Sequence, residues 1–102
     1  MSGDPSLVNG CRLDDLVREI LAEVLVIPSD EVRPGASLIR DLGAESIDFM
    51  DLVFRLEDAL GSSIPYTRWQ RFLEMNLADR DLSVAITPEV VQMFAQEEIA
   101  RA

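Results

Sequence analysis

The sequence contains no histidine and no lysine, and it has a single cysteine, Cys11. Without histidine the chain lacks the usual general base near neutral pH, the serine–histidine and cysteine–histidine pairs of nucleophilic catalysis, and the commonest zinc ligand. One cysteine forms neither an internal disulfide nor a thiolate metal cluster, which favours the reducing cytoplasm. Conventional hydrolase chemistry is therefore not expected, and Cys11 is interpreted as a half-buried residue at the head of the first helix.

Long apolar runs and positive charge are also scarce. No apolar run approaches the roughly 20 residues that a membrane-spanning helix needs, and residues 1–6 lack the basic and apolar stretches of a signal peptide. Nine arginines face 19 acids, which gives a formal net charge of −10 and makes nucleic acid a poor partner. We expect a soluble, cytoplasmic monomer with no transmembrane segment.

The 102 residues, 48% of them hydrophobic, suit one small domain with one core. Between residues 13 and 25 apolar residues recur at helical spacing and charged residues take the other side, so an amphipathic helix is expected to end before Pro28. Further helices are expected from Ser46 to about Gly61, from Ile64–Pro65 to about Met75, and from Thr87 onward, where Thr87 can cap the helix. No window shows the alternation of a strand. The prediction is a loose N-terminal tail over 1–10 and a single all-α domain over 11–102, with a long tethered loop over 28–45.

Ser46 stands at the expected start of a helix, directly after a glycine-containing turn. The commonest role of a serine there is an N-cap that accepts a hydrogen bond from a backbone N–H. A helix N-terminus also favours a phosphate electrostatically, so Ser46 can carry a covalent phosphodiester. The residues alone leave both interpretations open.

The stretch Asp41–Asp48 (DLGAESID), followed by Asp51–Glu57 and by Ile64–Pro65, resembles the acyl carrier proteins. The resemblance runs without a gap from Leu38 to Pro65. It implies a four-helix bundle whose serine, here Ser46, receives a 4'-phosphopantetheine arm from coenzyme A through a phosphopantetheinyl transferase. The thiol of that arm would hold acyl intermediates as thioesters for acyl-activating or acyl-transferring enzymes, in fatty acid, lipid, polyketide or modified-peptide biosynthesis.

Two departures from the family pattern are visible. Glu45 stands where the family most often has an aspartate before the serine, so the carboxylate is kept with one more methylene. The C-terminal third, from Tyr66 through Ser83, is longer and more basic than in a simple carrier. This extension suggests a specialised carrier rather than a housekeeping one.

The segment from Asp41 to Asp58 is strongly acidic, with six acids and one base, Arg55, for a local net charge of −5. Such clustering around an attachment site suggests docking to basic patches on client enzymes. Arg55 is interpreted as an intrahelical partner of Asp51 or Asp58, or as a filter against generic partners. By position, the resemblance assigns partner contacts to the following residues: Glu45, Ile47, Asp48, Asp51, Phe54 and Glu57.

Other residues have a plain structural interpretation beside a functional one. Trp69 and Phe72 are expected to be core or cover for the third helical region, or else a partner-binding patch. Candidates for an apolar interior that shelters an acyl chain, each more simply a core residue, are Phe49, Leu52, Val53, Leu56, Ile64 and Val91.

Two other functions compete with the carrier interpretation. The first is an unmodified acidic helical adapter or regulator that binds partner proteins non-covalently. The second is calcium binding, which fits badly because residues 41–51 do not reproduce the ligand spacing of an EF-hand.

Overall fold

The computed structural model of the chain describes residues 7–8 and 11–101. Four helices of 12 to 15 residues dominate it, and a single-turn helix and a minimal hairpin complete it. The predicted all-α fold, with four main helices and a long loop between the first two, is confirmed. In chain order the elements are β1 (Leu7–Val8), β2 (Cys11–Arg12), α1 (Leu13–Leu25), the 3₁₀ turn η1 (Ser29–Glu31), α2 (Ser46–Leu60), α3 (Tyr66–Leu77), α4 (Leu82–Ala85) and α5 (Pro88–Arg101).

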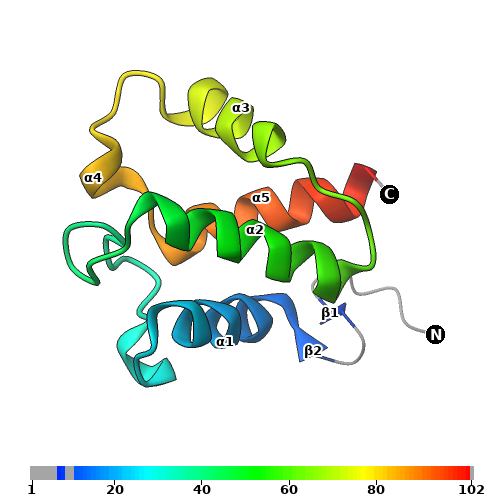
Figure 1. Cartoon of the computed structure of the whole chain (residues 1–102), viewed down its shortest axis with the longest axis horizontal. Coiled ribbons are helices and arrows are strands. Elements are labelled where there is room, and N and C mark those ends of the chain that lie inside the picture. The colour runs from blue at the N-terminus through cyan, green and yellow to red at the C-terminus, as the bar shows by residue number, and fades with distance from the viewer. Residues whose placement is uncertain (1–6, 9–10, 102) are drawn as a thin grey trace.

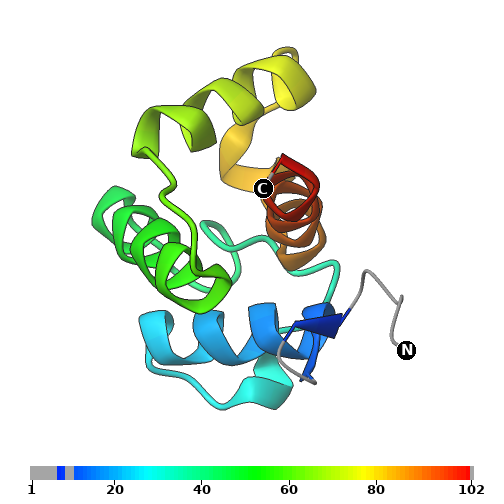
Figure 2. The same ribbon diagram turned by 90° about the vertical axis from the view of Figure 1, so that its right-hand side faces the viewer.

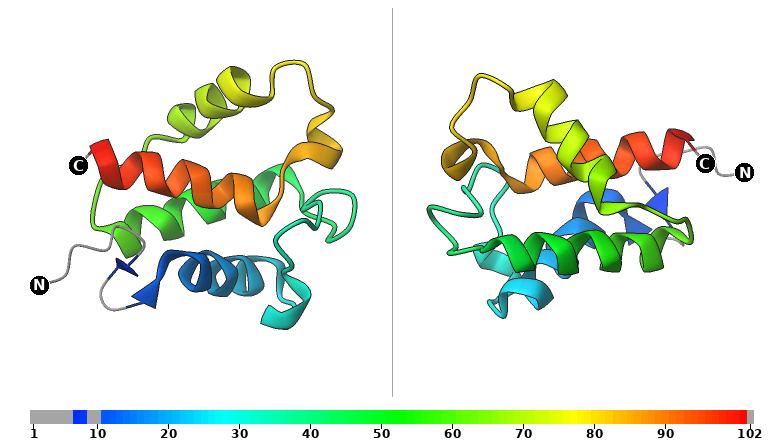
Figure 3. Two further views of the ribbon diagram at one scale, coloured as in Figure 1. Left: turned by 180° about the vertical axis from the view of Figure 1, so that it is seen from behind. Right: turned by 45° about the horizontal axis from the view of Figure 1, so that its top comes forward.

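The main helices enclose one core. Helix α1 packs against both α2 and α5, and α3 lies on the side opposite α1 (Figures 1 and 2). The loop between α1 and α2 and the short helix α4 lie together at one end of the molecule (Figure 3). The N-terminal end of α2 emerges from that loop, so the contacts of the loop position the start of the helix.

Helical spacing explains why α1 forms where it does. Its buried residues Leu13, Val17, Ile20, Leu21 and Val24 recur every three or four positions and face the core. Burying each such side chain contributes about 1.5–3 kcal/mol to the hydrophobic stabilisation of the fold. The helix ends with Val26 in the left-handed conformation, before Pro28, as the sequence predicts.

An aromatic cluster fills the space between α2, α3 and α5. Trp69 is 1% exposed, and its ring centroid lies 6.0 Å from that of Phe49, 6.1 Å from that of Phe72 and 5.1 Å from that of Phe94. The interpretation of Trp69 and Phe72 as core is therefore confirmed. The six residues considered for an apolar interior are also all buried members of this core.

A buried ion pair joins α3 to α5. The Nε and Nη2 atoms of Arg68 donate to the two carboxylate oxygens of Glu98 at 2.8 and 2.9 Å. The Glu98 side chain is 2% exposed and that of Arg68 is 30% exposed. Arg68 also donates to the carbonyl oxygen of Ser63 at 3.0 Å, and Nε of Arg101 lies 3.7 Å from the Glu98 carboxylate. The C-terminal third is thus tied to the bundle by charge as well as by apolar packing.

Two local features differ from the sequence analysis. Helix α3 continues to Leu77 rather than ending at about Met75, and a short helix that the sequence does not predict, α4, begins at Leu82. Two-residue strands β1 and β2 pair in antiparallel fashion, although no strand was expected. The predicted loose tail, residues 1–10, falls outside the described residues except at Leu7–Val8, and the side-chain surroundings of Cys11 also lie outside the description.

Candidate functional site

Glu45, rather than Ser46, is the N-cap of α2, which corrects the N-cap interpretation of Ser46. Glu45 has an extended backbone, and its N–H donates to the Asp48 carboxylate at 2.8 Å. The N–H of Asp48 in turn donates to the Glu45 carbonyl oxygen at 2.9 Å. Ser46 is therefore the first helical residue, and its hydroxyl is not needed to begin the helix.

The Ser46 side chain is exposed. Within the described part of the chain, no hydrogen bond involves its hydroxyl. The turn before it contains Gly43 at φ 76°, a conformation that favours glycine, and a Cβ there would meet nothing within 4 Å. The hydroxyl thus stands at an open helix N-terminus, where free backbone N–H groups favour a phosphate. These features fit a phosphodiester-linked group on Ser46, because adding one removes no contact that the fold uses.

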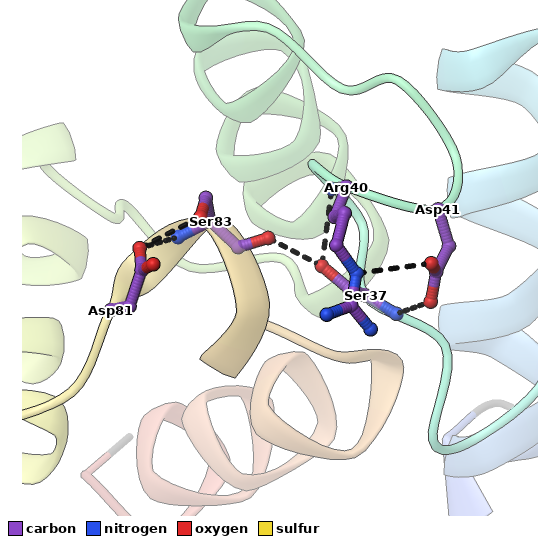
Figure 4. Close-up of polar contacts among 5 residues, drawn as sticks. All are labelled: Ser37, Arg40, Asp41, Asp81 and Ser83. Carbon is purple, nitrogen blue, oxygen red and sulfur yellow. Dashed lines mark hydrogen bonds and ion pairs between the residues drawn. The ribbon is translucent and has the colours of Figure 1, made fainter.

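A network of hydrogen bonds, centred on Ser37 and Ser83, holds the loop that leads to Ser46 (Figure 4). The buried Ser37 hydroxyl donates to the Ser83 carbonyl oxygen at 2.6 Å and accepts from the Arg40 N–H at 3.1 Å. The Ser37 N–H donates to the Asp41 carboxylate at 2.9 Å, and this bond lowers the pKa of Asp41. At the other end of the network, Asp81 accepts hydrogen bonds from both the hydroxyl and the N–H of Ser83, and these bonds lower the pKa of Asp81.

This hydrogen-bond network could not be predicted from the sequence. Ser37 and Ser83 are 46 residues apart, so no local pattern pairs them. Two backbone hydrogen bonds reinforce the network. The Leu38 N–H donates to the Ile86 carbonyl oxygen at 2.9 Å, and the Ala44 N–H donates to the Leu38 carbonyl oxygen at 2.8 Å. Together these contacts fix the turn from which Ser46 and α2 begin.

An exposed apolar row follows Ser46 along α2. Ile47 is 68% exposed and Phe54, two helical turns later, is 66% exposed, so the structure leaves both predicted apolar contacts at the surface. Met50 lies between them and is 55% exposed, and the sequence analysis did not single it out. Its position three residues after Ile47 and four before Phe54 is the signal that could have identified it.

The acids predicted as partner contacts differ in what they already bind. Glu45 is exposed, whereas the carboxylate of Asp48 is held by the Glu45 N–H. Glu57 accepts from the Ile64 N–H at 3.3 Å, and Asp51 accepts from Arg55 Nε at 3.0 Å. Asp51 and Glu57 therefore lie farther along α2, and only Glu45 and Asp48 belong to the start of the helix beside Ser46.

Arg55 links α2 to α1. Besides the expected intrahelical bond to Asp51, its Nη1 atom donates to Glu23 of α1 at 2.9 Å. The structure shows the Asp51 alternative for Arg55 and not the Asp58 one. The Glu23 partner could not be predicted, because it lies 32 residues away in the chain.

Two further observations concern residues 7–8 and 11–101. Over these ranges no group of three or more cysteine, aspartate or glutamate side chains is placed to hold a metal ion, so the calcium alternative gains no ligand set. In the same ranges every helix is too short or too polar to span a bilayer.

Comparison with known proteins places the chain in a family. Residues 15–68, just over half of the chain, match the family described as "Phosphopantetheine attachment site". The chain belongs to this phosphopantetheine-binding family, whose members hold the 4'-phosphopantetheine group covalently. The matched range contains α1 from its third residue onward, the loop, all of α2 and the start of α3.

Curated relatives with similar sequences are named "Acyl carrier protein AcpXL". The chain is 42% identical over 55 residues to the protein of Brucella melitensis, which covers 54% of this chain and 59% of that protein. It is 38% identical over 55 residues to the Rhizobium meliloti protein, covering 54% and 58%, and 33% identical over 67 residues to the Mesorhizobium japonicum protein, covering 66% and 72%. The chain thus spans less than two thirds of the length of the first of these relatives. The family match ends at residue 68 and so leaves residues 69–102 uncovered.

Proposed function

We propose that this protein carries acyl groups as thioesters on a 4'-phosphopantetheine group bound to Ser46, and that it does so in the cytoplasm. The observation that carries the proposal is the exposed Ser46 hydroxyl, without a hydrogen bond in the described structure, at the N-terminus of α2 and inside the matched range. The names of the relatives support an acyl cargo.

The chain's own residues prepare the attachment. The Glu45–Asp48 bond and the hydrogen-bond network of Ser37 hold the start of α2, where the exposed Ser46 is the first helical residue. The backbone N–H groups of that turn favour the charge of a phosphodiester. When bound, the group supplies a terminal thiol that holds a reactive acyl thioester.

The protein acts as a carrier and not as a catalyst. Its sequence has no histidine, and Ser46 has no base within hydrogen-bonding distance among the described residues. The chemistry therefore belongs to the enzymes that receive the loaded arm, which include a phosphopantetheinyl transferase and acyl-transferring enzymes.

The acidic surface of α2 guides those enzymes. Glu45 and Asp48 flank Ser46, and Asp51 and Glu57 follow on the same helix beside the exposed apolar row. Acids in such an arrangement speed encounter with a basic partner and orient it, whereas the apolar side chains supply contact area. Asp48, Asp51 and Glu57 each also hold an internal hydrogen bond, so their substitution affects stability as well as docking.

Mass spectrometry of the intact protein tests the attachment. The protein is incubated with coenzyme A, magnesium and a broad-specificity phosphopantetheinyl transferase. We expect the mass of one phosphopantetheine to be gained by wild type and by Ser63→Ala, an exposed-serine control, but not by Ser46→Ala. Ser46→Ala is expected to keep its fold, because the hydroxyl makes no hydrogen bond among the described residues. A gain that persists in Ser46→Ala would contradict the assignment, and no gain in any variant would favour the unmodified adapter.

Transferase kinetics test the role of Glu45. Glu45→Gln removes an exposed charge beside Ser46 and leaves the backbone cap intact. We expect its KM to rise about threefold or more at low salt and less at high salt, because screening weakens exposed charges. Glu97→Gln, an exposed acid on α5, is the matched control and should leave KM unchanged. Equal KM values for both variants would remove Glu45 from the docking surface.

A further inference from the structure

Val26, at the C-terminal end of α1, combines two unusual properties. It has φ 57° and ψ 51°, in the left-handed region, and it is 86% exposed. Over residues 7–8 and 11–101 it is the only residue other than glycine with a positive φ. Glycine is the usual residue at such a position, since a β-branched side chain is strained there. Neither packing nor backbone preference therefore explains a valine, and strain of this kind is characteristic of functional surfaces.

The surroundings of Val26 connect it to α2. Val26 and Ile27 lie on a shallow, open surface region that also includes Glu23 and Arg55, which form an ion pair. The same ion pair borders a second, deeper surface region, which is lined by Phe54 of α2. Two exposed apolar side chains, Val26 and Phe54, thus stand on either side of one charged bridge.

The charges in these two surface regions indicate which kind of partner can bind there. Glu23, Asp51 and Asp58 lie in them with Arg55 as the single cation, and the chain as a whole has a formal net charge of −10. A second copy of this chain would bring like charge to the same surface, and an anionic lipid surface would do so too. A protein surface that presents basic groups around one or two apolar side chains is complementary in both respects.

We propose that Val26 and the shallow surface region beside it form a contact surface for a basic client protein, continuous with the exposed apolar row of α2. The proposal rests on the proposed function, because it extends client docking from α2 onto the end of α1. Val26 then contributes to the choice of client, since its side chain enters the interface and a glycine would offer nothing to bind.

The client is obtained first, by photo-crosslinking. Phe54 is replaced by p-benzoylphenylalanine in the phosphopantetheine-loaded protein within its source cell, and the same replacement at exposed Met93 of α5 is the control. A protein that crosslinks through position 54 and not through position 93 is identified by mass spectrometry and purified. Absence of such an adduct, or an adduct only with a second copy of this chain, would overturn the proposal.

The affinity of the purified client for Val26 variants decides the question. Val26→Gly and Val26→Asn both suit a left-handed backbone, and Val84→Asn, on α4, is the matched control for loss of an exposed valine. We expect both Val26 variants to bind about tenfold more weakly, which corresponds to about 1.4 kcal/mol, and Val84→Asn to bind like wild type.

Affinity and melting temperature test the Val26 proposal, and they do so separately from the carrier function. Affinities of both Val26 variants within about twofold of wild type would overturn the proposal and leave the carrier function intact. A lower melting temperature for Val26→Gly would also overturn it, because the side chain would then serve folding. Failure of the carrier function itself is seen separately, as the absence of a mass gain at Ser46.

Discussion

The ion pair between Arg68 and Glu98 provides a quantitative test of how the C-terminal third is held. Arg68→Ala removes two hydrogen bonds of 2.8 and 2.9 Å to a carboxylate that is 2% exposed. The Glu98 charge then remains buried without its main partner.

The size of the effect follows from the burial of each partner. Breaking a fully buried pair by removing one partner costs about 3–5 kcal/mol. Here the Arg68 side chain is 30% exposed, and Arg101, at 3.7 Å, remains near Glu98. We therefore expect a loss of about 2–3 kcal/mol, which for a domain of this size lowers the melting temperature by about 10–20 °C.

Urea denaturation followed by circular dichroism measures this loss. Arg71→Ala, an exposed arginine on the same helix, is the control and should change the free energy of unfolding by less than about 0.5 kcal/mol. The double variant Arg68→Met with Glu98→Leu should recover most of the lost stability, because apolar side chains replace a buried pair at little cost. Equal stabilities of Arg68→Ala and Arg71→Ala would refute the argument.

Three further predictions concern the loop and the end of α2. Gly61→Ala, at φ 68° with its N–H on the Glu57 carbonyl oxygen, should cost about 1–2 kcal/mol in urea denaturation, and no cost would show that the left-handed cap relaxes. Ser37→Ala removes the hydrogen bond to Ser83 and should lower the free energy of unfolding by about 1 kcal/mol. It should also speed amide hydrogen exchange in the loop, and unchanged exchange would argue against a role of this hydrogen-bond network in holding the loop. The Ser37 N–H lowers the pKa of Asp41 below its ordinary value of 3.8. The ionised Asp41 carboxylate therefore stabilises the folded state above about pH 4, and this stabilisation is lost as the pH falls. Asp41→Asn should therefore flatten the acid side of a plot of urea midpoint against pH, and an unchanged slope would contradict that reasoning.

The long helices could be predicted from the sequence, because their apolar residues repeat over three or four turns. Helix α2 begins at Ser46 and ends before Gly61 as expected, and Thr87 caps α5 by accepting from the Val90 N–H at 3.3 Å. The elements that were missed, α4 and the hairpin of β1 and β2, are four residues or fewer in each segment. Segments that short complete no period, so tertiary contacts decide their structure.

The candidate site divides in the same way. Ser46, Ile47 and Phe54 are exposed, and the family resemblance rather than helical periodicity singles them out. The contacts that hold the site come from residues distant in sequence, such as Ser83 bound to Ser37 and Glu23 bound to Arg55. Glu98 shows the same limit, because a glutamate in a charged helix is expected at the surface and only its partner 30 residues away explains its burial.

The most direct test of the central claim is the intact mass of the protein recovered from its own source cell, before and after treatment with hydroxylamine. We predict a mass that corresponds to the chain plus phosphopantetheine plus an acyl group, loss of the acyl group alone on treatment, and an unmodified chain for Ser46→Ala. Wild-type protein that carries neither group, in cells where a known carrier is loaded, would contradict the claim that Ser46 bears an acyl-carrying arm.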